Sequence, residues 1–302
     1  MTELEGHVGQ HGPLLTTPAP RAPNAPVQRV VEVVGRRPVG AYVELAFDAP
    51  EVAGRAVPGQ FVAFAVGGRE SAMLLRRSIA IAGTGDGRLT AVVAPHGPGS
   101  TWLAGRQPGD TVDVVGPLGR PFPLPEPGTA ALLVGGGYGA AALVGLAGAL
   151  RERGSDVAAV AGAATADRLC SVDELTALAD VTVLTDDGSA GRRGWVTDAV
   201  AELVGKVGVV YACGPMGMLR AVAELATAAG VPSYVAVEES MACGIGVCMT
   251  CVLPVVGADG RTRFSRSCTE GPVFGGDRVR FADVGTLTAD VVGAAAMGVL
   301  PA

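Results

Sequence analysis

Three of the six cysteines in this chain fall within nine residues, in the segment Glu239–Pro254, ESMACGIGVCMTCVLP. They are Cys243, Cys248 and Cys251, and sixteen residues separate the last of them from Cys268. Zinc sites favour two Cys-x2-Cys knuckles, and only one such pair is present. The order Cys-x4-Cys-x2-Cys is instead the plant-ferredoxin pattern of [2Fe–2S] ligation. We therefore predict that these four cysteines hold a [2Fe–2S] cluster, with a zinc site or structural thiols as the alternatives.

The residues between the cysteines suit a loop that wraps a cluster. Gly244 and Gly246 permit the sharp turns that aim backbone N–H groups at sulfur. Ile245, Val247 and Met249 are apolar and are expected to shield the cluster from water. Because such a cluster moves one electron at a time, the rest of the chain should hold a partner cofactor.

Composition argues against several classes of protein. The net charge is −6 with no basic stripe, which argues against nucleic-acid binding. No apolar run reaches the roughly 18–20 residues that a membrane span needs. No basic and then apolar signal peptide opens the chain, so we expect a cytoplasmic protein, where clustered cysteines serve as metal or redox sites rather than disulfides.

Residues 27–126 contain short β-like runs separated by Gly, Pro or Asp. Six such runs over about a hundred residues predict a small antiparallel β-barrel. The runs are 27–34, 41–47, 60–66, 77–83, 88–94 and 110–116.

Residues 127–232 alternate between apolar β-like runs and helical segments, which predicts a parallel sheet with helices on both faces. The first run, AALLVGGG, is continuously apolar, as in a strand that is buried on both faces. The expected helices span 140–153, 171–179, 195–204 and 216–230, and the expected strands after the first span 156–163, 181–187, 207–214 and 233–239.

A glycine-rich turn follows the first of these strands. Gly135, Gly136, Gly137 and Gly139 lie where the strand ends and the helix begins. Helix N-termini offer free N–H groups to a pyrophosphate, and glycine lets a ligand approach the backbone closely. The strict G-x-G-x-x-G spacing is only loosely met, so an ordinary tight turn remains the alternative.

Two later strands of this sheet also end in polar or small residues. Ligands of such sheets bind at the carboxyl ends of the strands, where Cys213, Gly214 and Asp186 are expected. The Asp186 carboxylate would accept a ribose hydroxyl. A packing role for Cys213, and a polar turn and helix cap for Asp186, are the alternatives.

The barrel carries two candidate phosphate-binding segments. Arg76 and Arg77 are suited to bidentate phosphate contacts, and Gly99 and Ser100 offer backbone amides and a hydroxyl. Read alone, these residues favour solvated arginines and a turn.

Taken together, the motifs resemble those of the ferredoxin reductase-like flavoproteins, and within them the family of electron-transfer subunits of NAD-linked (class B) dihydroorotate dehydrogenases. The resemblance covers residues 27–282, and the cysteine segment directly after the nucleotide domain is its discriminating feature. The motifs run in order: an Arg-Pro-x-Ser type segment at 77–80, a Gly-x-Gly-Thr type segment at 97–101, GPLG at 116–119, GGG-x-G at 135–139, TDDGS at 185–189, CGP at 213–215 and MACGIGVC at 241–248.

The resemblance implies a domain order and a set of binding residues. It implies an FAD-binding β-barrel (27–126), an NAD-binding α/β domain (127–232) and a [2Fe–2S] domain (233–282). Residues 1–26, rich in Pro, Gly, Ala and Thr without periodicity, are predicted to be a disordered leader, and residues 283–302 form a tail. The residues implied for FAD are Arg77, Ser78, Ile79, Ala80, Val92, Val93 and Ala94, with Gly99 and Ser100 on the pyrophosphate. Those implied for NAD are the GGG turn, Asp186 and Gly214, with Cys213 as a catalytic residue.

The chain departs from the family pattern in the flavin segment. Ser78 replaces the usual proline, and Ala80 replaces the usual serine, so a side-chain hydrogen bond to the flavin is missing at position 80. We still expect FAD to bind through the remaining backbone contacts. The choice between NAD and NADP stays open, with Arg168 the nearest candidate for a 2′-phosphate contact.

The function implied by the resemblance is electron transfer in pyrimidine biosynthesis. Electrons would pass from the FMN of a catalytic subunit through the [2Fe–2S] cluster and FAD to NAD+, in a heterotetramer of two catalytic and two electron-transfer subunits. The alternatives are a related reductase subunit that serves another partner, such as a sulfite reductase or hydrogenase, and a zinc-stabilised module that binds its nucleotide without catalysis.

Overall fold

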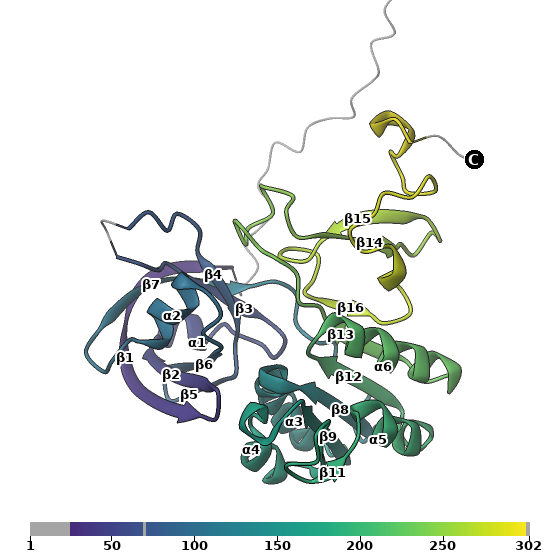
Figure 1. Ribbon diagram of the computed structural model, residues 1–302, viewed down its shortest axis with the longest axis horizontal. Coiled ribbons are helices and arrows are strands. Elements are labelled where there is room, and N and C mark those ends of the chain that lie inside the picture. The colour runs from purple at the N-terminus through teal and green to yellow at the C-terminus, as the bar shows by residue number, and fades with distance from the viewer. Residues whose placement is uncertain (1–24, 69–70, 300–302) are drawn as a thin grey trace, which may run out of the picture.

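Two seven-stranded sheets and a small hairpin form the framework of the computed structural model, which describes residues 25–68 and 71–299. In Figure 1 the barrel, the nucleotide sheet and the C-terminal unit surround a common centre. The leader expected over 1–26 lies almost entirely outside the described residues, as do the last three residues of the tail.

The first sheet is the expected antiparallel barrel, with the order β4-β3-β7-β1-β2-β6-β5. The two end strands, β4 and β5, follow each other in the chain, which closes the barrel: Ile81 N–H donates to the carbonyl of Gln60 before β3 at 3.1 Å, and Ala82 N–H donates to the carbonyl of Thr90 in β6 at 2.9 Å. All six predicted strands are present. The elements are β1 (Val27–Val39), β2 (Tyr42–Asp48), α1 (Pro50–Ala53), β3 (Phe61–Phe64), β4 (Arg77–Ala80), β5 (Gly83–Gly85), β6 (Arg88–Val93), α2 (Pro98–Ala104) and β7 (Thr111–Leu118).

Alternation along β6 divides its side chains between two environments. Leu89, Ala91 and Val93 are buried in the barrel core, whereas Val92 and Ala94 belong to a separate apolar cluster that includes Ala141 of the nucleotide unit. Successive side chains of a strand point to opposite faces. The side chain of Val93 therefore points away from the surface where a flavin was expected, and only its backbone is available there.

The second sheet has the order β11-β10-β9-β8-β12-β13-β16 and is parallel except for β16, which runs antiparallel to β13. The predicted strand and helix order is confirmed. Its elements are β8 (Ala131–Gly136), η1 (Gly137–Ala140), α3 (Ala141–Glu152), β9 (Val157–Ala163), η2 (Ala166–Arg168), α4 (Val172–Thr176), β10 (Asp180–Thr185), β11 (Arg192–Arg193), α5 (Val196–Leu203), η3 (Val204–Lys206), β12 (Val209–Cys213), α6 (Met216–Ala228), β13 (Ser233–Ala236) and β16 (Val273–Gly275).

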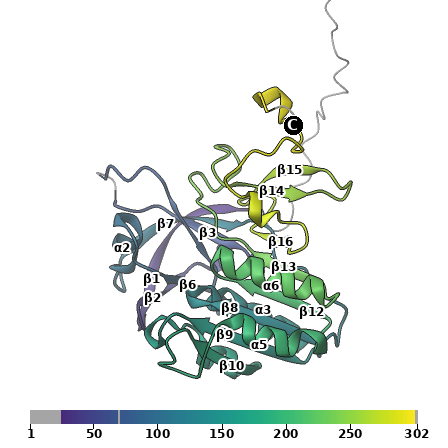
Figure 2. The same ribbon diagram turned by 45° about the vertical axis from the view of Figure 1, so that its right-hand side comes forward.

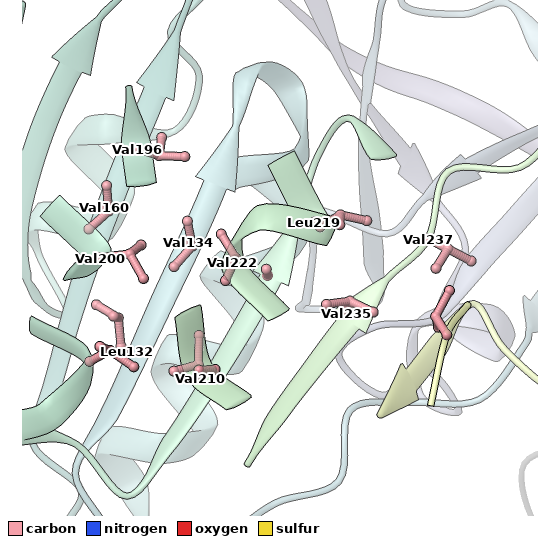
Figure 3. Packing of buried hydrophobic residues seen from close by; sticks show 14 of the residues in the cluster. Leu132, Val134, Val160, Val196, Val200, Val210, Leu219, Val222, Val235 and Val237 are labelled. Carbon is pink, nitrogen blue, oxygen red and sulfur yellow. The ribbon is translucent and has the colours of Figure 1, made fainter. Parts of the chain in front are cut away.

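Both faces of this sheet are covered. Leu132 and Val134 of β8 pack with α5 and α6 on one face (Figure 3), and Ala131 and Leu133 pack with α3 on the other. Figure 2 shows α5 and α6 lying side by side over the strands. Burial on both faces explains why the sequence of β8 is continuously apolar.

Two helices differ from the sequence-based expectation. The helix expected over 171–179 is only α4, because the chain makes tight turns at Leu178 and Ala179 and enters β10 at Asp180. The segment at 97–101 was expected to be a turn, but it opens α2. Pro98 occupies the first helical position, where its missing N–H is tolerated.

The C-terminal unit consists of the hairpin β14 (Val252–Val256) and β15 (Thr262–Arg266), followed by β16 and two short turns, η4 (Phe281–Asp283) and η5 (Ala295–Met297). Leu253 and Val255 join the same core as α6. The expected division at 232/233 therefore falls within the nucleotide sheet, since β13 and β16 both belong to it. Part of the tail is also packed, because Ala294 is buried and Val292 donates to the carbonyl of Thr262 at 2.9 Å.

Candidate flavin, nucleotide and iron–sulfur sites

Three of the predicted cluster ligands lie in the loop between β13 and β14, the cysteine loop, and Cys268 follows β15. Cys251 and Cys268 are 2% and 1% exposed, whereas Cys248 lies on the surface. Gly244 and Gly246 have φ angles of +70° and +83°, in the left-handed region that glycine tolerates best. The chain curls around Cys243, as the sequence predicts for a loop that wraps a cluster.

Backbone amides point at the first sulfur of this loop. The N–H groups of Ile245, Val247 and Cys248 donate to Sγ of Cys243 at 3.4–3.5 Å. Although burial opposes the charged form, these donors lower the pKa of Cys243. Hydrogen bonds from the hydroxyl and N–H of Thr250 lower the pKa of Cys248 to about 6. Both shifts favour the thiolate, the form that binds metal.

The four thiols form two pairs rather than a single cage. Cys243 contacts Cys248, and Cys251 contacts Cys268. Across residues 25–68 and 71–299, no three His, Cys, Asp or Glu side chains gather closely enough for a single metal ion. A [2Fe–2S] cluster needs two thiolates on each of two irons, so the donor set fits that cluster.

The cysteine loop packs directly against the barrel. Cys251 and Cys268 share an apolar cluster with Phe61 of β3 and Leu118 of β7. A Cβ atom placed on Gly244 would lie 3.5 Å from Oγ of Ser78 in β4. The predicted cluster loop and the predicted flavin segment are therefore in contact.

A pocket of about 280 Å³ lies where the three units meet. Its walls fit a flat aromatic group, because they are mostly apolar and small. The predicted residues that line it are Ser78, Ile79, Ala80, Val92, Ala94, Ser100, Gly139, Cys213 and Gly214. The pocket thus brings together residues from the barrel, the glycine turn and the CGP turn, which supports an FAD ring at this place.

The predicted phosphate-binding residues are close together beside this pocket. The Arg77 guanidinium lies against the backbone of Gly99, where an added Cβ would approach Nε of Arg77 to 2.4 Å. The Ser100 hydroxyl accepts from the N–H groups of His96 and Gly97 at 2.9 and 3.1 Å, so it also fixes the start of α2. Arg76, in contrast, pairs with Asp113 at 2.7 Å.

Cys213 lines the same pocket at the end of β12. Burial, and then the nearby Glu238 carboxylate, raise the pKa of Cys213 to about 12. The side chain is consequently a neutral thiol at physiological pH. It can contact a ligand ring, but it is not an activated nucleophile.

A second pocket of about 860 Å³ opens at the carboxyl ends of β8, β9, β10 and β12. Gly136, Gly137 and Asp186 line it, as predicted, together with Arg168. Gly135 does not line either of these two pockets; it packs on Ala140, where an added Cβ would clash at 2.6 Å. The position at the strand ends is the one where open α/β sheets bind nucleotides.

Several lining residues were not foreseen from the sequence. Tyr138 and Glu238 line both pockets, and Met241 lines the first. Trp195, 67% exposed, lines the second. Tyr138 occupies the variable position of the GGG-x-G turn, and Trp195 precedes a helix, so no motif in the sequence indicated that either residue lines a pocket. His96 also lines the first pocket.

The comparisons with known proteins agree with this geometry. Residues 238–280 match the family model "Iron-sulfur cluster binding domain of dihydroorotate dehydrogenase B", a span that contains all four clustered cysteines. The electron transfer subunit of dihydroorotate dehydrogenase B (NAD(+)) from Bacillus caldolyticus is 42% identical over 221 residues, covering 72% of this chain and 84% of that protein. This chain belongs to the family of those electron transfer subunits.

Other members of the family are more distant but match over a longer stretch. The subunit from Desulforamulus reducens is 37% identical over 82% of this chain and 94% of its own length. The probable subunit from Methanopyrus kandleri is 38% identical, covering 81% of this chain and 88% of its own length. The family membership thus extends over the barrel, the nucleotide unit and the cysteine unit.

Solved structures support the same fold. A chain of an NADH-dependent reduced ferredoxin–NADP oxidoreductase, described for flavin-based electron bifurcation, superposes with a TM-score of 0.75 at 33% identity, covering 84% of this chain and 91% of that one. The ferredoxin reductase of a carbazole 1,9a-dioxygenase has a TM-score of 0.58 at 24% identity, covering 68% and 67%, which shows the fold alone. Within the described residues, no helix is long and apolar enough to cross a membrane.

Proposed function

We propose that this chain is the electron-transfer subunit of an NAD-dependent dihydroorotate dehydrogenase, which carries electrons from the FMN of a catalytic subunit to NAD+ in pyrimidine biosynthesis. One observation carries the proposal. The cysteine loop contacts Ser78 of the flavin segment, and that segment lines a pocket that also reaches the nucleotide-binding turns. This arrangement of the three predicted redox sites is the one that such a relay requires, and it supports the proposal.

Each unit of the chain contributes a defined part. The four paired cysteines would hold the [2Fe–2S] cluster, Arg77 with β4 and β6 would hold FAD, and the strand-end pocket would hold NAD. When bound, the flavin exchanges single electrons with the cluster and hydride with nicotinamide. The chain itself orients these groups and excludes water between them, through the apolar walls of the smaller pocket.

The surface around the cysteine loop is suited to a protein partner. Ile245, Val247 and Met249 are 55%, 75% and 51% exposed, and they surround Cys248. The sequence predicted that these side chains shield the cluster from water, but within this chain they are exposed. Exposed apolar groups of this kind mark interaction surfaces. We propose that the FMN-containing catalytic subunit covers them, in a heterotetramer of two catalytic and two electron-transfer subunits.

Reconstitution with the catalytic subunit tests the function. The complex should reduce NAD+ when dihydroorotate is added, and Cys268→Ser should abolish this activity together with the visible bands of the cluster. Cys170→Ser is the matched control, because Cys170 is buried to the same degree, 2% exposed, and is not one of the predicted cluster ligands. Wild-type complex that contains both cofactors but transfers no electrons from dihydroorotate would refute the proposal.

A second candidate is a subunit of the same kind that serves another enzyme. The observation that favours it is the 33% identity to a chain of a reduced ferredoxin–NADP oxidoreductase; a sulfite reductase or hydrogenase is a further candidate partner. The partner that copurifies with the chain, and its electron donor, distinguish these functions. The cytoplasmic location stays a prediction, to be tested by fractionation. The choice between NAD and NADP is open from the sequence, and a comparison of the two nucleotides as acceptors decides it.

A further inference from the structure

The two pockets adjoin each other at Tyr138 and Glu238. Both residues line the smaller pocket and the larger one. The hydroxyl of Tyr138 donates to the Glu238 carboxylate, although the two residues are a hundred positions apart in the sequence. This hydrogen bond connects the glycine turn after β8 to the segment after β13, at the place where the two pockets adjoin.

Beside this pair, packed backbone separates the two pockets. A Cβ on Gly139 would lie 2.5 Å from the carbonyl oxygen of Cys213, and a Cβ on Gly214 would lie 3.0 Å from the backbone of Gly136. The two strand-end turns are thus in direct contact. The side chain of Tyr138, from the glycine turn, extends to Glu238 where the two pockets adjoin.

The ring of Tyr138 is held in this position from two sides. Tyr42, from barrel strand β2, meets it edge-on with centroids 5.5 Å apart, and His96 lies 6.2 Å away on another side. Burial, and then Glu238, raise the pKa of Tyr138, so its phenol remains a donor at physiological pH. The ring is therefore fixed in place, but its hydrogen bond ends on an exposed carboxylate that a ligand can also reach.

We propose that Tyr138 and Glu238 form a latch between the flavin pocket and the nucleotide pocket, which opens when the nicotinamide ring enters and offers its carboxamide N–H to Glu238 in place of the tyrosine hydroxyl. The inference rests on the proposed function. Hydride transfer requires the two rings to approach within about 3–3.5 Å, so the nicotinamide end of a nucleotide in the larger pocket must pass this pair.

Binding measurements on the holoprotein separate the latch from the nucleotide site. NAD+ has a nicotinamide ring to insert, whereas ADP-ribose lacks it and occupies only the larger pocket. Tyr138→Phe keeps the aromatic ring and removes the hydrogen bond that must break. We expect NAD+ to bind about five- to tenfold more tightly to Tyr138→Phe than to wild type, with the affinity for ADP-ribose unchanged within about twofold.

Two further variants complete the experiment. Tyr234→Phe is the matched control, since Tyr234 is a half-buried tyrosine of the nucleotide sheet that lines neither pocket. In this variant the affinities for NAD+ and ADP-ribose should both stay at the wild-type values. Glu238→Ala removes the latch and also the acceptor for the carboxamide, so NAD+ should gain less affinity than in Tyr138→Phe.

The outcomes separate failure of the latch from failure of the function. If Tyr138→Phe changes the affinities for NAD+ and ADP-ribose by the same factor, or changes neither, the latch is refuted while the nucleotide site stands. If Glu238→Ala tightens NAD+ binding as much as Tyr138→Phe does, the exchange of hydrogen bonds is refuted. If neither nucleotide binds the wild-type holoprotein, the proposed function itself fails.

Discussion

Gly244 of the cysteine loop lies against Ser78 of barrel strand β4, so closely that a Cβ atom on the glycine would come within 3.5 Å of the serine Oγ. The two residues are far apart in the sequence and belong to different units. Ser78 also lines the smaller pocket. This contact places the cluster ligands next to the expected flavin without any intervening layer of the chain.

Gly246→Ala should lose most of the iron from the purified protein. Gly246 has φ of +83°, where a side chain costs about 1–2 kcal/mol, and the new Cβ would lie 2.8 Å from the methyl group of Thr269. Gly260→Ala is the control, because Gly260 has φ of +76° and open space around it in the turn of the β14–β15 hairpin. Iron and sulfide analysis of both variants checks this. Equal iron in the two would show that the loop tolerates a side chain at 246.

Ala80→Ser should strengthen FAD binding. Ala80 is exposed in the smaller pocket, so a serine restores the hydroxyl that the flavin segment lacks. One added hydrogen bond of about 1 kcal/mol slows FAD dissociation roughly fivefold. Ala82→Ser, which does not line the pocket, should leave dissociation unchanged. Flavin fluorescence after dilution measures both rates, and an unaltered rate for Ala80→Ser would remove position 80 from the flavin site.

Trp195 should report nucleotide binding. It is one of two tryptophans, and its exposed ring lines the nucleotide pocket, where an adenine can stack on it. ADP-ribose should quench the tryptophan fluorescence of wild type and of Trp102→Phe, since Trp102 packs under Arg106 in the barrel. The quenching should vanish in Trp195→Phe. Quenching that persists in this variant would place the adenine elsewhere.

Cys213 should react with iodoacetamide only at high pH. With a pKa near 12, its thiolate fraction at pH 8.5 is roughly three orders of magnitude below that of an ordinary thiol. In the native protein the rate should keep rising about tenfold per pH unit from pH 9 to 11. In the urea-unfolded chain it should level off above the ordinary thiol pKa. Mass spectrometry of the labelled peptide measures both profiles, and a native plateau near pH 9 would show that the thiol is not buried.

The sequence was most informative where all the residues of a motif lie in one short segment. The cysteine spacing lies within a single loop and one hairpin, and the strand and helix order follows from apolar periodicity. The start of α2 was missed because Gly97, Pro98 and Gly99 are typical of turns, although proline is tolerated at the first helical position.

Features that depend on contacts between units could not be predicted. Tyr138 and Glu238 meet only because the glycine turn and the segment after β13 converge at the barrel. Val93 was expected among the flavin residues, but strand alternation turns its side chain into the barrel core. The packing of the cysteine loop against Phe61 and Leu118 is likewise a tertiary contact that the sequence pattern does not show.

Anaerobic addition of NADH to the purified chain, followed by absorption and low-temperature electron paramagnetic resonance, tests the contact between the flavin and cluster sites most directly. Bleaching of the flavin band should be accompanied by the paramagnetic signal of a reduced [2Fe–2S] cluster, and Cys268→Ser should retain the bleaching and lose the signal. A wild-type protein that contains iron and flavin, but whose flavin is reduced while its cluster stays oxidised and silent, would contradict the account.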